Sequence, residues 1–286
     1  MPIWTFDLPD DIQPILALDL STLSVVTAPG AGRTVTVEAD EILEPLLDVT
    51  ADGAKVSIRQ IALVGRERFA GIWPWGSQTS RVRVTVPDGT RLDARLDAGS
   101  ISAEHSWEEV QIRTSAGSIR LGDCMSAQVY ADAGSIVIGA LHDGSVRAQA
   151  GSVRICSTTG TVSAHTEAGS VKVVEAYEGS LDLSSEMGTV SVGVPEGTAV
   201  LADCHSDFGR VTTDLPRQDH PDALERRLEL RARAQMGTVR VRRAWEHGQR
   251  AGRRPADKRI TGTDLGADRC AAPTVPGPPP GRWRWE

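Results

Sequence analysis

A set of mostly acidic side chains recurs at one position of a sequence repeat and has the clearest potential for chemistry. Each stands two residues before a glycine: Asp97, Ser115, Asp132, Gln149, Glu167, Glu186 and Asp207. If these segments stack, the carboxylates form a column, and carboxylate oxygens are ligands that Ca²⁺ prefers. The Gly-Gly-x-Gly-x-Asp pattern of calcium-binding β-rolls is absent, however, and acidic residues also suit turns. We therefore interpret the column as solvent-facing turn residues and expect no cofactor and no metal.

Cysteine and histidine residues suggest zinc at first sight. The adjacent pair Cys204-His205 could combine with Cys124, Cys156 and His165 from neighbouring repeats. Zinc sites normally show two close ligand pairs with characteristic spacing, and here there is one pair. We interpret the cysteines as small packed hydrophobic residues.

The redox state of the cysteines depends on the compartment. The chain has four, at 124, 156, 204 and 270, with no Cys-x-x-Cys pair. The N-terminal residues show no basic segment followed by an apolar one, so we see no signal peptide and expect a cytoplasmic protein with reduced thiols.

Catalytic spacing is not evident. Polysaccharide-cleaving β-helices place two carboxylates across a groove, but acids are so abundant here that nothing selects one pair. The Gly-Ser pairs follow the repeat and not a strand-to-helix nucleophile turn. We predict that the chain is not an enzyme.

An aromatic cluster is the best candidate for an interaction site. It comprises Phe69, Ile72, Trp73 and Trp75 in a chain with only 4% aromatic residues. Such a cluster is typical of a contact with a partner or a membrane surface. The alternative, which we favour, is that the segment folds over the end of the repeat region as part of a cap.

The elements that must position these residues are repeated short strands. A Gly-Ser/Thr-apolar tripeptide recurs at intervals of 18, 17, 17, 18 and 19 residues, beginning at Gly99, Gly117, Gly134, Gly151, Gly169 and Gly188. Apolar-x-apolar pairs follow each glycine and recur nine or ten residues later, which indicates short strands with one buried face. We predict an all-β fold: a single-stranded β-solenoid with two short strands in each turn of about 18 residues. A right-handed coil follows from the rule for parallel crossovers.

Three regions follow from this pattern. Residues 1–90 alternate apolar and polar residues between turn signals, which predicts a β-sandwich-like cap continuous with the solenoid. Residues 91–245 form the repeat region, closed by a last turn at Gly237–Val241. Residues 246–286 are rich in Gly, Pro and Arg, which predicts a disordered tail.

The chain resembles a bacterial family of unknown function that is labelled as an adhesin and built from β-strand repeats. The resemblance rests on Trp4 and Phe6, Pro14–Leu18, Val82–Thr90, the Asp-Ala-Gly-Ser-Ile repeats from Asp97, and Met236–Ala244. It covers about residues 1–245. It implies a β-repeat fold and transfers no catalytic residue.

The net charge of −7 argues against nucleic acid as a partner, and no segment is apolar enough for a membrane helix. Our first hypothesis is a non-enzymatic interaction or scaffold module that binds an unknown protein or itself. The alternatives are a solenoid that stacks end to end into filaments and a carbohydrate-binding or carbohydrate-active β-helix protein.

Overall fold

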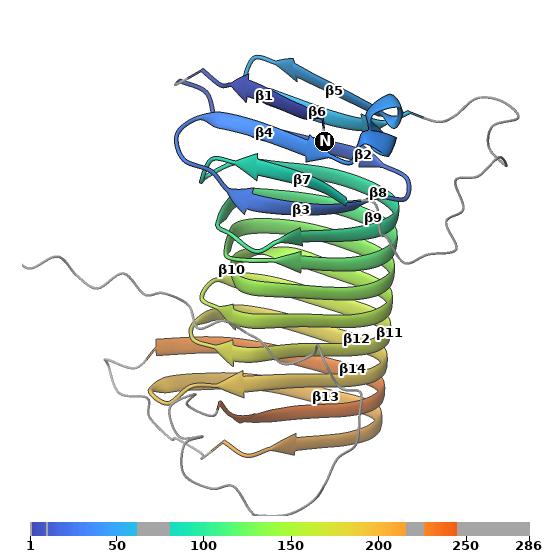
Figure 1. Cartoon of the computed structure of the whole chain (residues 1–286). Helices are drawn as coiled ribbons and strands as arrows, with labels where there is room; N and C mark the ends of the chain where they lie inside the picture. The colour runs from blue at the N-terminus through green and yellow to red at the C-terminus, as the bar shows by residue number, and fades with distance from the viewer. Residues whose placement is uncertain (1, 10, 62–80, 216–225, 245–286) are drawn as a thin grey trace, which may run out of the picture.

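The chain folds almost entirely into β-strands that share one open sheet (Figure 1). The computed structural model describes residues 2–9, 11–61, 81–215 and 226–244. The strands are β1 (Ile3–Asp7), β2 (Ile15–Leu20), β3 (Ser24–Pro29), β4 (Thr34–Ala39), β5 (Leu47–Asp52), β6 (Lys55–Gln60), β7 (Arg81–Val86), β8 (Arg91–Ala103), β9 (Trp107–Leu121), β10 (Cys124–Thr158), β11 (Thr161–Ala176), β12 (Gly179–Val194), β13 (Thr198–Thr213) and β14 (Arg226–Arg243). A short 3₁₀ helix, η1 (Glu41–Leu46), precedes β5. The all-β prediction is confirmed.

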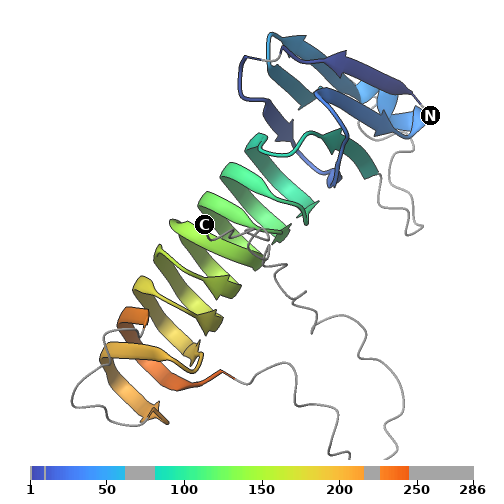
Figure 2. The same cartoon turned by 90° about the vertical axis from the view of Figure 1, so that its left-hand side faces the viewer.

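Successive repeats pair in parallel with equivalent residues side by side, and the bands stack along one direction (Figure 2). The repeat glycines mark the register, because Gly99 pairs with Gly117, Gly117 with Gly134, and Gly169 with Gly188. The apolar pairs predicted between residues 101 and 192 face inward and are buried. The handedness of the winding and the solenoid class itself stay predictions.

Each repeat glycine lies where a side chain would strike the preceding repeat. Gly134 has a φ of 130°, and a Cβ placed on it would collide with the carbonyl oxygen of Gly117. Gly117 and Gly151 have the same relation to the repeats before them. Only glycine tolerates both the positive φ and the close backbone approach, which accounts for its recurrence.

At the N-terminal end of the stack, parallel pairing gives way to antiparallel pairing. β2 and β3 lie in register with the two halves of β8, and β6 and β7 add parallel neighbours beyond them. The pairs β1–β4, β4–β7 and β5–β6 are antiparallel. Strands therefore form within the alternating residues of the N-terminal region, at 3–7, 15–20, 24–29, 34–39, 47–52, 55–60 and 81–86.

The far end of the sheet differs from the sequence-based expectation. The repeat that contains Gly237 was expected to close the stack, but β14 lies between β12 and β13, so β13 is outermost. The physical reason is apolar content. The inward residues of β14 include Leu228 and Leu230, each at most 1% exposed, whereas β13 offers the smaller Val200 and Ala202 at the matching positions. Burying the more apolar strand gains more free energy, at about 25 cal/mol for each Å² removed from water.

Candidate functional site

The outermost strand, β13, has one free backbone edge within the described residues. It pairs with β14 from Thr198 to Thr213, and the strand order ends there. An unpaired edge offers a row of N–H and C=O groups to another strand. Among the described residues, this edge of β13 is left open to such pairing.

Apolar side chains on this end are exposed to solvent. Phe208 is 77% exposed, Leu201 74% and Val211 41%. Val211 occupies a position at which the inner repeats bury Val or Ile, for it pairs with the buried Val239. The hydrophobic interior thus reaches the surface at β13.

Two positions of β13 depart from the pattern of the inner repeats. The residue before the repeat glycine is alanine in five successive repeats (Ala98, Ala116, Ala133, Ala150 and Ala168) and then becomes Met187, Met236 and Phe208 toward the end. The residue after the glycine is Ser or Thr in every repeat from Ser100 to Thr238, but Arg210 in β13. The changes gather large apolar and charged groups at the end of the stack.

Sequence reasoning missed this end as a site. Its signal was the degenerate copy Gly209-Arg210-Val211, together with polar or small residues at the inward positions, such as Cys204 and Ser206. The strand order was needed to show that this copy, and not the one at Gly237, is outermost.

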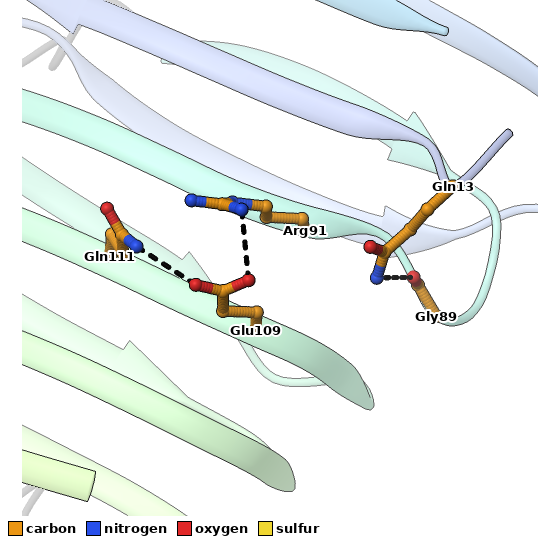
Figure 3. Close-up of polar contacts among 5 residues, drawn as sticks. All are labelled: Gln13, Gly89, Arg91, Glu109 and Gln111. Atoms are coloured by element: carbon orange, nitrogen blue, oxygen red, sulfur yellow. Dashed lines mark hydrogen bonds and ion pairs between the residues drawn. The ribbon is translucent and has the colours of Figure 1, made fainter.

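A second surface feature is a shallow groove of about 450 Å³ on the outer face of β8, β9 and β10. Two columns of polar side chains line it: Asp93, Gln111, Gln128 and Ser145 in one, and Arg95, Arg113, Tyr130 and Arg147 in the other. At one side of the groove, the Glu109 carboxylate accepts hydrogen bonds from Arg91 at 3.1 Å and Gln111 at 2.9 Å (Figure 3). A separate bond from Gln13 to the carbonyl of Gly89 joins the start of β2 to the turn before β8.

Tyr130 is the aromatic residue of this groove. Its hydroxyl accepts a hydrogen bond from the Gln149 amide at 2.9 Å. The hydrogen bond to Asp132 raises the pKa of Tyr130, so the phenol stays protonated at neutral pH. The groove therefore presents an aromatic ring among amides, guanidinium groups and a carboxylate.

The acidic column lies beside a basic one. Arg95 lies two residues before Asp97, and His165 lies two residues before Glu167. Arg95 and His165 belong to one column across the strands, which also contains Arg113, Arg147 and Arg233. Alternate residues share a face, so opposite charges flank the carboxylates. In the described ranges, no three His, Cys, Asp or Glu residues are grouped as metal ligands. The interpretation as solvated turn residues stays a prediction.

The cysteine and histidine residues considered for zinc point in different directions. Cys204 pairs with the inward-facing Ala232, whereas the exposed His205 binds Asp207 at 2.9 Å. His165 instead contacts the hydroxyl of Ser184 at 2.8 Å. Cys124 is buried, and burial raises the pKa of its thiol to about 12.

The prediction of reduced thiols holds for Cys124 and Cys204, which are free, but is wrong at Cys156, which is disulfide-bonded. Cys270 lies outside the described residues, as do the aromatic candidates Phe69, Ile72, Trp73 and Trp75, and the proposed tail at 246–286. In the part of the chain that the structure covers, no helix has the length and apolarity needed to cross a bilayer.

Fold and surface together define an open, repetitive β-sheet protein with the edge strand β13 at one end of the stack and a polar lateral groove. The chain belongs to the family described as Toastrack DUF4097, whose model matches residues 15–244. The resemblance to an adhesin-labelled family of unknown function is thereby confirmed. No curated protein matches the chain.

A search of solved structures also gives matches at low identity. A "putative lipid binding protein" from Parabacteroides distasonis shares 10% identity, covering 84% of this chain and 96% of that chain, with a TM-score of 0.49. A "putative adhesin" from Parabacteroides merdae shares 9% identity over 84% and 95%, with a TM-score of 0.45. Another "putative adhesin", from Bacteroides fragilis, shares 9% over 84% and 96%, with a TM-score of 0.38. At these values the names carry no argument about what this chain binds.

Proposed function

We propose that this chain is a non-enzymatic interaction module of the β-solenoid type that binds an extended polypeptide segment through the free edge of β13. The observation that carries the proposal is an unpaired strand edge flanked by exposed apolar side chains, Leu201, Phe208 and Val211. Strand addition to a free edge supplies affinity through main-chain hydrogen bonds and specificity through alternate side chains.

The position of β13 supports this proposal. Native proteins protect edge strands with prolines, charges, bulges or covering segments, because an open edge invites pairing. β13 carries charges at Asp203, Asp207 and Arg210, but no proline, and its apolar residues face solvent among them. An edge that is apolar and charged in alternation suits a specific partner.

A photo-crosslinking amino acid at the exposed Thr212 of β13 tests the proposal in the full chain. The control carries the same group at Ser163, an exposed residue on the inner strand β11. After irradiation in cell extract, we expect polypeptide adducts from position 212 but not from 163, and we expect Phe208→Lys to reduce them. Equal labelling from both positions, or no adduct from either, would refute binding at the edge.

A carbohydrate-binding role is a second candidate, and the lateral groove favours it. Amide and guanidinium groups beside Tyr130 can hydrogen-bond hydroxyl groups while the ring packs against a sugar face. Titration with neutral and acidic oligosaccharides, followed by calorimetry, should show binding that Tyr130→Ala abolishes. Absence of heat with every oligosaccharide would remove this candidate.

End-to-end filaments have less support. The N-terminal end of the stack carries antiparallel pairs, including β1 with β4 and β5 with β6, so it does not offer the parallel repeat that β13 offers. The cytoplasmic location stays a prediction.

A further inference from the structure

We propose that the partner of β13 is β13 of a second copy, paired antiparallel about a two-fold axis to give a closed dimer joined end to end. The proposal rests on the proposed function, because it names the occupant of the same free edge. Three observations on the end of the stack lead to it: the shape of the exposed interior, the order of charges along β13, and the difference between the two ends of the chain.

The exposed interior requires a cover of matching cross-section. At the end of the stack the inward positions of β13, including Ala202 and Val211, are open to solvent. This interior lies between two arms of β13 that meet at Gly209, which pairs with the repeat glycine Gly237. A single extended segment could pair with one arm only. A second copy offers two arms with the same bend, so it covers both.

The order of residues along β13 is self-complementary. With a two-fold axis through the bend, the arm before Gly209 in one copy pairs antiparallel with the arm after Gly209 in the second copy. Inward residues must stay opposite inward residues, because side chains alternate between faces. In the register that superposes the two bends, Ser206 faces Val211 and Cys204 faces Thr213 on the inside.

On the outside, the same register places Asp207 opposite Arg210 of the second copy, and Arg210 opposite its Asp207. Both side chains are exposed, and Arg210 replaces the hydroxyl found in every inner repeat. Opposite charges that face each other across strands stabilise the pairing, whereas like charges oppose it. In this register Phe208, which continues the column of Met187 and Met236, lies opposite Gly209 of the second copy.

The two ends of the stack of strands differ, which favours a closed dimer over an open filament of many copies. A two-fold interface uses the same surface on both subunits and is complete with two copies. The antiparallel strands at the N-terminal end do not reproduce this surface. A two-fold pairing through β13 uses that edge of both copies, so this interface is complete at two.

Charge reversal gives a direct test with the full chain. The wild type should sediment with about twice the 30.6 kDa mass of one chain. Asp207→Arg alone and Arg210→Asp alone place like charges opposite each other, so each should raise the dissociation constant at least about tenfold. An equimolar mixture of the two variants restores both opposite pairs and should recover the dimer, as should the double variant Asp207→Arg/Arg210→Asp.

Circular dichroism checks that each variant folds, and Gln128→Ala in the lateral groove is the matched control that should leave the dimer unchanged. A monomeric wild type would overturn the proposal, as would a dimer that the single charge reversals leave intact. These failures differ from failure of the proposed function. Crosslinks from position 212 to another protein, with a monomeric wild type, would keep edge binding and reject self-pairing.

Discussion

Replacement of Gly134 by alanine tests whether the repeat glycines hold the stack together. Two costs add at this position. Gly134 has a φ of 130°, which an alanine rarely adopts, and its Cβ would strike the backbone oxygen of Gly117 in the preceding repeat. Backbone cannot rotate away as a side chain does, so the two repeats must separate locally.

The magnitude follows from these two costs. A positive φ costs an alanine about 1–2 kcal/mol, and forcing extra atoms into a packed site costs about 1–3 kcal/mol. Separation of the strands also weakens ladder hydrogen bonds, each worth about 1 kcal/mol. We expect Gly134→Ala to lower the free energy of unfolding by about 3–6 kcal/mol, a large part of the 5–15 kcal/mol typical of native proteins.

Gly53→Ala is the matched control. Gly53 also has a positive φ, 58°, but a Cβ there would meet nothing within 4 Å. Only the conformational cost applies, so we expect a loss of about 1–2 kcal/mol. Urea unfolding followed by circular dichroism measures both losses. If Gly134→Ala costs no more than Gly53→Ala, the close approach between repeats does not constrain the sequence.

Three further predictions test the packing and the charges. Leu230→Ala in β14 should lower the free energy of unfolding by about 2–5 kcal/mol in a urea titration, and Val200→Ala in β13 should lower it by less than about 1 kcal/mol. The difference is expected because β14 has a neighbouring strand on both sides and β13 on one side. Equal losses would contradict the strand order. Burial raises the pKa of Cys124 to about 12, so this thiol should resist iodoacetamide at pH 8, whereas the half-buried Cys204 should react slowly. Mass spectrometry measures the alkylation of both cysteines. Fast alkylation of Cys124 in the folded protein would refute its burial. Burial lowers the pKa of His105, so as the pH falls the unfolded chain binds a proton at this residue before the folded chain does. The melting temperature should therefore fall as the pH drops below about 6.5. The variant His105→Gln should lose this part of the pH dependence, and an unchanged pH profile of the variant would refute the role of His105.

Much of the fold could be predicted because the repeat glycine marks where successive repeats approach each other closely. The glycine recurs where neither a side chain nor a negative φ fits, and alternate apolar residues beside it, such as Ile136 and Ile138, mark the buried face. The period of two and the spacing of the glycines therefore predicted where strands lie and which residues they bury. These are local properties, readable from the chain.

The strand order at the end could not be predicted from local pattern alone. The repeats at Gly209 and Gly237 each fit next to β12, and the spacing favours Gly209, which follows Gly188 by 21 residues against 49 for Gly237. The ranking comes from a comparison of inward residues, in which Leu228 and Leu230 exceed Val200 and Ala202 in apolar area. Such a choice is made by competition between segments for the same edge, and the candidate site depends on it.

The place of β14 also bears on how the protein is made. β13 leaves the ribosome before β14, and the 30 residues from 214 to 243 take about 2–6 s to synthesise at 5–20 residues per second. During that interval β12 has an open edge and β13 is the segment at hand. The finished order requires β14 to enter between two strands already synthesised. A nascent chain that pairs β13 with β12 before β14 is made would have to release that pairing to reach the final strand order.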